Sequence, residues 1–295
     1  MGGGTAVGMP TVTPTKVTWT STTGVYELYG TGFSASASGL TGTATRVTYS
    51  EKGVVLASAD GVNLSVSEVL KISQSPNMVD ALIATFLPQD NIFKLSGAND
   101  IVKAGIGNDT VYGGGGKDTV IIDNGAFGGT KFKDFKFSKA ADGGTVLTDG
   151  KFTTTLYDVE RVQFSDGVVA FDNAGIAGQA YRLYQAAFDR TPDASGLNFW
   201  VKNMDAGGGL NAAASSFITS AEFKSKYGSL SDTGFVDQLY KNVLGRSADK
   251  GGIDFWVGQL ETHKLVRAGV LAGFSESGEN VVLVAPAIDN GIWLG

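Results

Sequence analysis

The chain contains no cysteine, so neither disulfide bonds nor thiolate metal sites can stabilise it. No hydrophobic run approaches the ~20 residues that a membrane-spanning helix needs, so no transmembrane segment is expected. The first seventeen residues lack the basic and apolar regions of a secretory signal, so any export is expected to use a route without one. The net charge is −6 and no basic patch is present, which argues against nucleic acid as a partner.

Motifs of common catalytic sites are also missing. The sequence has no GxSxG, HExxH or P-loop pattern, and a nucleophilic triad would depend on its only histidine, His263. His263 lies near the end of a predicted helix, where a solvated side chain is expected. Nothing isolates a carboxylate pair, although the N-terminal region contains acids without supporting groups, among them Glu27, Glu51, Asp60 and Glu68. The sequence therefore predicts a protein that is not an enzyme.

Glycine, in contrast, is abundant, with 42 residues, and seven of them lie in one repetitive stretch, residues 95–123. The stretch divides into the nine-residue units LSGANDIVK, AGIGNDTVY and GGGGKDTVI. Asp100, Asp109 and Asp118 occupy the same position of successive units, and a valine follows each of them two residues later. This is the nonapeptide GGxGxDxUx, a calcium-binding repeat of parallel β-helical structures.

Each unit is expected to form a glycine-rich turn followed by a very short strand. The inward-pointing valines build a thin core, while turn carbonyls and carboxylates supply the hard oxygen ligands that Ca²⁺ prefers. The turn positions expected to serve the ion are glycines in the second and third units, namely Gly105, Gly107, Gly114 and Gly116.

Successive units of a β-roll alternate between its two sides, so each ion is expected to lie between units eighteen residues apart. This spacing pairs Asp100 with Asp118, and it pairs Asp109 with Asn91 of a partial unit. The first unit has Leu95, Ser96 and Ala98 where the motif has glycine, so about one to three ions are expected.

The rest of the chain predicts a multidomain β plus α protein. Residues 1–85 are expected to form a β-rich domain, with strands over 16–65 and helices over 67–73 and 77–86 that cover the open end of the roll. Ser65 or Ser67 is the candidate cap of the first helix. Residues 86–172 are expected to form the parallel β-roll with capping strands, and 173–295 an all-α repeat domain.

The α-helical region is an internal repeat. Residues 183–201 match residues 239–257 at an offset of 56, and residues 217–222 match 274–279 at an offset of 57. This pattern predicts two copies of a helical hairpin unit, neither of which buries its apolar face alone.

The loop from Asp189 to Gly196 has the spacing of a calcium loop but departs from the EF-hand at its sixth and twelfth positions. Helix capping is favoured instead, with Thr191 as N-cap and Pro192 as the first helical residue. Asp193 favours the helix dipole, and Ser247 and Asp249 repeat this arrangement in the second copy. Two ion pairs are expected, Arg190 with Asp193 and Arg246 with Asp249.

The repeated aromatic residues are expected to pack in a core rather than to form a sugar-binding shelf; they are Tyr184, Phe199 and Trp200 in the first copy and Tyr240, Phe255 and Trp256 in the second. The N-terminal aromatics Trp19, Tyr26 and Tyr29 could either face a ligand or fill a sheet core.

Two family resemblances cover most of the chain. The nonapeptides, followed by the segment ERVQFSDG at 160–167, resemble those of repeats-in-toxin (RTX) proteins exported by type I secretion. The helical half resembles a domain-of-unknown-function family with the signature LYxxxxxRxxDxxGxxFW, which stands at 183–200 and 239–256. The resemblance implies a secreted, calcium-loaded protein of the cell surface or extracellular space, with an uncleaved C-terminal export signal.

These observations favour a protein that folds on calcium after export and acts by binding or self-assembly, as an S-layer, filament or biofilm adhesin does. Its expected partners are other copies of itself, a cell-surface or matrix component, and the type I export machinery. The alternative is a secreted toxin or hydrolase, or its export module, which uses calcium only for folding.

Overall fold

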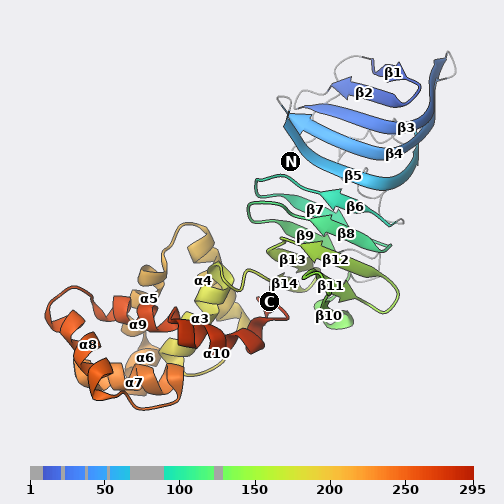
Figure 1. The fold of residues 1–295 in the computed structure, drawn as a ribbon. Helices are drawn as coiled ribbons and strands as arrows, with labels where there is room; N and C mark the ends of the chain where they lie inside the picture. Colours follow the sequence, from blue (N-terminus) through green and yellow to red (C-terminus); the bar gives the residue numbers. More distant parts are fainter. Residues whose placement is uncertain (1–8, 21–23, 37–38, 52–53, 67–89, 123–128) are drawn as a thin grey trace. The chain divides into compact units, whose positions relative to one another are not determined.

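The computed structural model describes residues 9–20, 24–36, 39–51, 54–66, 90–122 and 129–295. The chain forms two compact units, Met1–Val168 and Val169–Gly295. Within the described residues the first unit is built of β-strands and the second contains eight α-helices (Figure 1). Both the β-rich N-terminal region and the helical C-terminal region agree with the sequence. None of the helices in the described part has both the length and the hydrophobicity needed to span a bilayer.

The first unit begins with an antiparallel meander, in which each strand pairs with the next along the chain. Its strands are β1 (Thr11–Thr13), β2 (Lys16–Thr20), β3 (Val25–Ser36), β4 (Gly39–Glu51) and β5 (Val54–Ser65). Their alternating patterns bury one face, so Val17, Leu28 and Val47 are in the core. The strands predicted over residues 16–65 are therefore confirmed.

The repeat strands extend this sheet on one side. Strand β6 (Ile92–Lys94) pairs antiparallel with β5, and β8 (Asp109–Tyr112) pairs parallel with β6. Figure 1 shows the meander running directly into these strands. Strand β5 thus covers the edge of β6. The helices that were predicted to cover this end of the roll, over 67–73 and 77–86, lie outside the described residues, as does the proposed cap Ser67. The separation of residues 1–85 from 86–172 as domains stays a prediction.

The alternate repeats form a second sheet. Strand β7 (Ile101–Ala104) pairs parallel with β9 (Thr119–Ile122), so that Val102 lies opposite Val120. The same offset of eighteen residues relates β6 to β8, where Ile92 lies opposite Thr110. Val111 and Val120 are fully buried, while Val102 is half-buried. Successive repeats therefore alternate between two sheets, and their valines form the narrow core between them.

Strands after the repeats continue both stacks. In the larger sheet β12 (Thr153–Tyr157) pairs parallel with β8, and in the smaller sheet β13 (Arg161–Phe164) pairs parallel with β9. Strands β11 (Thr145–Thr148) and β10 (Lys136–Lys139) complete the ten-stranded sheet at its far edge. A 3-10 turn, η1 (Phe132–Asp134), precedes β10.

A short hairpin ends this region, since β14 (Gly167–Ala170) follows β13 in the smaller sheet. Phe132, Phe135 and Phe137 gather around Phe164, with ring centroids 5.3–6.3 Å from it. This aromatic cluster closes the end of the thin core that the valines begin.

The second unit repeats a pattern of four helices. The first copy contains α3 (Ile176–Phe188), α4 (Ala194–Asp205), α5 (Leu210–Thr219) and α6 (Ala221–Tyr227). The second contains α7 (Asp232–Leu244), α8 (Lys250–Glu261), α9 (Arg267–Ser275) and α10 (Gly278–Ile288). A short strand, β15 (Ile292–Trp293), then pairs antiparallel with Val169 and Ala170.

Equivalent helices of the two copies pack against each other, α3 on α7 and α5 on α9. At the α3–α7 contact the buried side chain of Asn242 donates a hydrogen bond to the carbonyl of Ala186, the residue at its own position in the first copy. Arg182 is buried in α3 and forms two hydrogen bonds with Glu276 of the second copy. Each copy thus covers the apolar face of the other, as the internal repeat predicts.

Candidate metal centre

The repeat aspartates reach across the stacked strands. The carboxylate oxygen Oδ1 of Asp109 accepts a hydrogen bond from the backbone N–H of Asn91 at 3.0 Å. Oδ1 of Asp118 accepts one from the backbone N–H of Asp100 at 2.8 Å. In both cases the donor lies eighteen residues earlier, at the corresponding point of the parallel neighbour. The structure therefore brings together the pairs Asn91–Asp109 and Asp100–Asp118.

The second oxygen of two of these carboxylates is buried without a hydrogen-bond donor. Among the described residues, Oδ2 of Asp109 and Oδ2 of Asp118 have no such partner, and the two residues are 2% and 0% exposed. Burial raises the pKa of Asp109 to about 6, although the N–H groups of Asn91 and Gly105 partly oppose this shift. Burial also raises the pKa of Asp118 to about 6, helped by the charges of Glu160 and Asp100.

Such an arrangement is costly for a protein without a cation, because a buried anion needs a hydrogen-bond donor or an opposite charge. A divalent cation at the Oδ2 side would supply that charge and would favour the ionised carboxylates. The two buried oxygens therefore fit a bound metal ion, and their hardness suits Ca²⁺.

The glycine turns come close to neighbouring turns. Gly107, Gly114 and Gly116 have φ angles of 132°, 88° and 106°, which side chains other than glycine rarely adopt. A Cβ on Gly114 would lie 2.5 Å from the carbonyl oxygen of Ser96. The turns therefore stack through main-chain atoms, and main-chain carbonyls lie within reach of the same region. Gly105 and Gly107, which shortly precede Asp109 in the sequence, are also buried.

One glycine lies directly beside Oδ2 of Asp118, the oxygen without a hydrogen-bond donor. A Cβ on Gly113 would lie 2.6 Å from Oδ2 of Asp118 and 1.8 Å from the carbonyl oxygen of Asp158. The carboxylate oxygen and this carbonyl oxygen therefore border the same space, which only glycine leaves open. Two hard oxygens of different residues on one small space form part of a ligand set that Ca²⁺ would take.

Asp100 differs from the other repeat aspartates. Its Oδ2 accepts hydrogen bonds from the backbone N–H and the hydroxyl of Ser96, at 2.8 and 2.6 Å. Ser96 stands where the motif has glycine, so in this degenerate unit the turn itself satisfies the carboxylate. Asp100 therefore has less capacity for a metal ion than Asp109 or Asp118.

Sequence reasoning missed Glu160. Its Oε2 accepts a hydrogen bond from the backbone N–H of Asp118 at 2.8 Å, just as Asp118 accepts one from Asp100. Glu160 thus continues the series of carboxylates into the strand that follows the repeats. The available signal was its position directly before β13, but the offset of 42 residues from Asp118 breaks the repeat period.

A second series of hydrogen bonds was also missed, and it comes from the residues directly before Asn91, Asp100 and Asp109. Side-chain oxygens of Asp90, Asn99 and Asn108 accept from the backbone N–H groups of Asn108, Lys117 and Thr153. The Asn-Asp and Asp-Asn pairs were visible in the sequence. Their polar side chains secure the turns and leave the next residue free to face inward.

No group of three or more His, Cys, Asp or Glu side chains in the described part of the chain is arranged to hold a metal. An ion at Asp109 or Asp118 would consequently depend on main-chain carbonyl oxygens for most of its ligands. Calcium accepts such mixed sets of six to eight oxygens.

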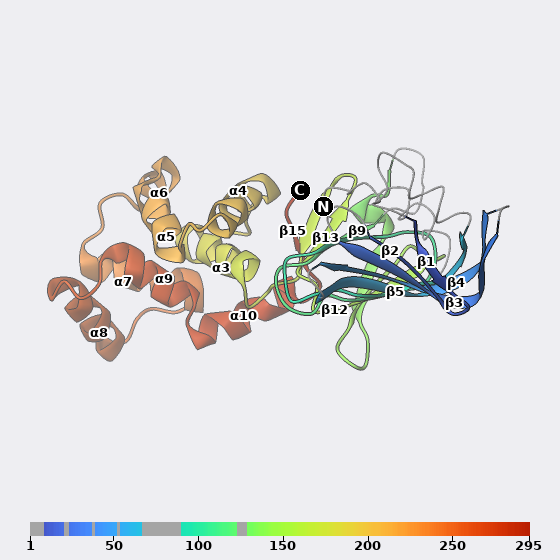
Figure 2. The same ribbon diagram turned by 90° about the horizontal axis from the view of Figure 1, so that it is seen from above.

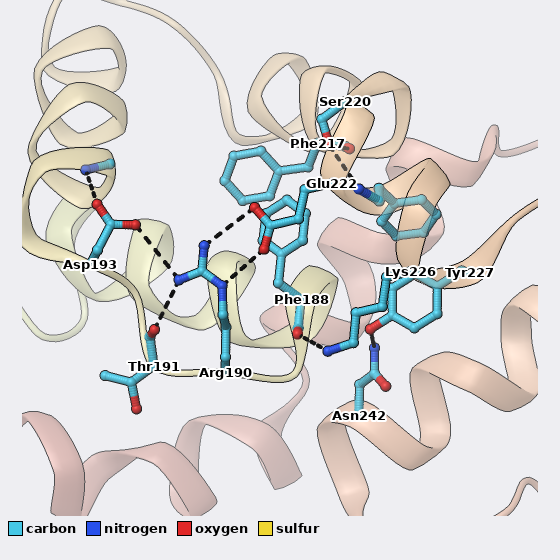
Figure 3. Close-up of polar contacts among 12 residues, drawn as sticks. Phe188, Arg190, Thr191, Asp193, Phe217, Ser220, Glu222, Lys226, Tyr227 and Asn242 are labelled. Carbon is cyan, nitrogen blue, oxygen red and sulfur yellow. Dashed lines mark hydrogen bonds and ion pairs between the residues drawn. The ribbon is translucent and has the colours of Figure 1, made fainter.

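The helical signature has a structural role. The guanidinium of Arg190 forms two hydrogen bonds with Glu222, at 2.9 and 3.3 Å (Figure 3). It also lies over the ring of Tyr184. Its contact with Asp193 is longer, at 3.6 Å. In the second copy Arg246 pairs with Glu279 rather than with Asp249. The predicted arginine pairing is therefore wrong for the second copy and secondary in the first, because the next helix offers a better-placed carboxylate.

The helix caps also differ from the prediction. Asp193, not Thr191, is the N-cap of α4, and its side chain accepts a hydrogen bond from the N–H of Gly196. Asp249 caps α8 in the same way. Pro192 therefore lies before the helix rather than in its first turn, since a carboxylate three residues before an N–H is an equally good cap. These carboxylates are engaged in capping, which disfavours the calcium-loop interpretation of Asp189–Gly196.

The repeated aromatics divide into two groups. Tyr184 and Tyr240 are buried, and Trp200 and Trp256 pack on Phe217 and Phe274, with ring centroids 4.9 Å apart. The core prediction is confirmed for these. It is wrong for two others, which are large, apolar and exposed on the helix surface, namely Phe199 at 61% and Phe255 at 58%.

The remaining candidates do not converge on a site in the described residues. Trp19 and Tyr26 are buried and stacked, which favours a core role for this pair, while Tyr29 bonds to Glu27. Glu27 pairs with Lys16, and Asp60 pairs with Arg46. Glu68 lies outside the described residues. His263 is exposed just beyond the end of α8, as the sequence predicts.

Comparison with known families agrees with this division. Residues 94–126 match the family model described as RTX calcium-binding nonapeptide repeat (4 copies). Residues 179–210 and 214–284 match the domain of unknown function DUF4214. No curated protein matched the chain. The first match supports Ca²⁺ as the ion of the repeat region, and proteins with such repeats are typically secreted.

Proposed function

We propose that the chain is a secreted protein whose repeat region folds as a parallel β-roll when it binds calcium outside the cell, after export by a type I route. The observation that carries this proposal is the pair of buried carboxylate oxygens, Oδ2 of Asp109 and of Asp118, that have no donor among the described residues. In a calcium-poor cytoplasm these charges and the glycine-rich turns oppose folding, since ordering the backbone costs about 1–2 kcal/mol per residue. At millimolar calcium, binding free energy becomes folding free energy.

The mature protein then acts by binding or self-assembly at the cell surface or in the extracellular matrix, and not as an enzyme. The tandem helical unit supports this role, because both of its copies expose a phenylalanine at the same repeat position, Phe199 and Phe255. The role as a toxin, hydrolase or export module is the weaker alternative, because no observation favours it.

A calcium titration tests the proposal, followed by circular dichroism for folding and by light scattering for assembly. Calcium should increase β-structure in the wild-type protein. Asp118→Asn and Asp109→Asn should each weaken this response at least tenfold, because each removes one buried ligand. Asp100→Asn should weaken it less, since Ser96 already satisfies that carboxylate.

The matched control is Asp134→Asn, which removes one charge from an exposed position of the same unit. It should leave the response unchanged. Growth of regular particles with calcium would support self-assembly, whereas a calcium-folded monomer would leave binding as the mode of action. A wild-type protein whose circular dichroism does not change with calcium would refute the proposal.

A further inference from the structure

The two copies of the helical unit allow an internal comparison. At an offset of 56 residues both copies keep the same residue at eight positions of the signature region, 183–201 and 239–257. In the first copy most of these residues have a clear structural role. Leu183, Tyr184 and Val201 are buried, and Trp200 packs on Phe217. Arg190 pairs with Glu222, and Asp193 caps α4.

The glycine has a structural role as well, because a Cβ on Gly196 would lie 2.5 Å from the hydroxyl of Tyr184. The equivalent Cβ on Gly252 would lie 2.2 Å from the hydroxyl of Tyr240. The phenylalanine is the exception. Phe199 and Phe255 are 61% and 58% exposed, so burial does not explain why both copies keep the same large apolar residue.

The neighbouring tryptophan fixes the position of each ring. Phe199 lies edge to face with Trp200 at 5.1 Å and 87°, and Phe255 lies in the same way against Trp256 at 5.1 Å and 79°. Since the tryptophan in turn packs on an aromatic residue of the next helix, each phenylalanine is held in place. Two exposed aromatic rings with closely similar geometry are thus presented by α4 and α8.

A carboxamide accompanies each ring. Asn203 follows Phe199 by four residues, and Gln259 follows Phe255 by four, so each lies on the same helix face as its ring. Asn203 is exposed and Gln259 half-buried. The exposed charges nearby differ between the copies, since Lys202 lies near the first ring, whereas Asp254 beside the second is paired with Lys250. What the two surfaces share is therefore an aromatic ring with a neutral hydrogen-bonding group.

This combination suits a neutral sugar. A pyranose ring places its C–H groups on an aromatic ring, while its hydroxyl groups exchange hydrogen bonds with a carboxamide. A protein partner fits less well, because a stable protein interface buries about 800 Å² on each side. Each surface here centres on a single exposed ring within a polar helix.

The two surfaces are also separate. Figures 1 and 2 both show α4 and α8 at opposite ends of the helical unit. One protein chain could therefore hold two points of a polymer, or two polymer chains. Linked weak sites gain about 10²–10⁴ in overall binding strength over a single site.

We propose that Phe199 with Asn203, and Phe255 with Gln259, form twin contact sites for a neutral polysaccharide. This proposal names a partner class for the extracellular role proposed above and rests on that role. The sites lie in the helical unit, so they do not involve the repeat carboxylates.

Affinity electrophoresis of the calcium-loaded full chain tests the proposal, in native gels that contain dextran, xyloglucan or galactomannan, with alginate as an acidic comparison. At least one neutral polymer should retard the wild-type protein. Phe199→Ala or Phe255→Ala should each weaken retardation at least tenfold through loss of bivalency, and the double variant should abolish it. Val282→Ala, at a residue 73% exposed on α10, is the matched control and should migrate as wild type.

Circular dichroism of the same samples separates this proposal from the calcium proposal, because calcium-induced folding should be equal in all variants. Folding that responds to calcium without retardation by any neutral polymer would overturn only the sugar sites. Retardation by alginate alone, or retardation that the double variant keeps, would also overturn them. So would loss of self-association in the double variant without any change in polymer binding, because the rings would then be contacts between protein copies.

Discussion

Replacing Asp109 with asparagine should stabilise the metal-free repeat region at neutral pH and, at the same time, weaken its response to calcium. Asparagine keeps an oxygen for the N–H of Asn91 but carries no charge. Without calcium the buried carboxylate is a cost, whereas with calcium it is a ligand. A residue that only supported the fold would lose stability in both conditions.

The size of the effect follows from the pKa. Burial raises the pKa of Asp109 from 3.8 to about 6, so ionising this group in the folded chain costs about 3 kcal/mol more than in the unfolded chain. The folded, metal-free state holds its proton to higher pH than the unfolded state. Stability from this group is therefore full below about pH 4 and is lost as pH rises through about 6. Asp118 shifts in the same direction.

Hydrogen exchange measured by mass spectrometry on peptides from residues 90–122 provides the assay, with calcium chelated and rates corrected for intrinsic exchange. Protection of the wild-type repeats should fall between pH 5 and pH 7.5, and Asp109→Asn should reduce this dependence. At pH 7.5 the variant should be more protected, by up to about 3 kcal/mol of opening free energy. A variant that is less protected without calcium, with an unchanged pH dependence, would refute the reasoning.

Three further substitutions test the packing of the two units. Gly116→Ala should destabilise the repeats by more than about 1–2 kcal/mol and abolish the calcium response in circular dichroism. The reason is that the φ angle of Gly116 is 106° and a Cβ there would lie 2.6 Å from a neighbouring carbonyl. Gly97→Ala is the control and should be nearly neutral, because a Cβ at Gly97 would meet no atom within 4 Å. Arg182→Ala should lower the stability of the helical unit to urea by about 3–5 kcal/mol, since it leaves Glu276 without its buried partner; a loss below about 1 kcal/mol would contradict this. Asn242→Ala should cost about 1–3 kcal/mol in the same assay by leaving the buried carbonyl of Ala186 and the part-buried hydroxyl of Tyr227 without their donor, and an unchanged midpoint would argue against that contact.

Period and spacing were enough to predict the pairs of the candidate metal centre. Because the nonapeptides repeat without insertion, an offset of eighteen residues brings Asp109 to Asn91 and Asp118 to Asp100. Glu160 was not predictable in this way, since the hairpin of β10 and β11 intervenes between the repeats and β13. The contribution of a residue beyond the repeat depends on the length of that insertion, which no period specifies.

Local sequence left three other choices open that the structure decides. Thr191 and Asp193 are both good N-caps, and the helix begins after the second. Arg190 has Asp193 three residues away, yet it pairs more closely with Glu222 of a helix that follows later. Phe199 is as hydrophobic as its neighbour Trp200, but only one of the two faces the next helix, and the sequence pattern does not distinguish them.

The most direct test of the central claim is to locate the ions. A crystal structure of the protein grown with calcium, with anomalous diffraction used to identify the metal, should show ions about 2.3–2.6 Å from Oδ2 of Asp109 and from Oδ2 of Asp118. Main-chain carbonyls of the glycine turns should complete each ligand set. Ordered repeats at millimolar calcium with no ion at either oxygen would contradict the account.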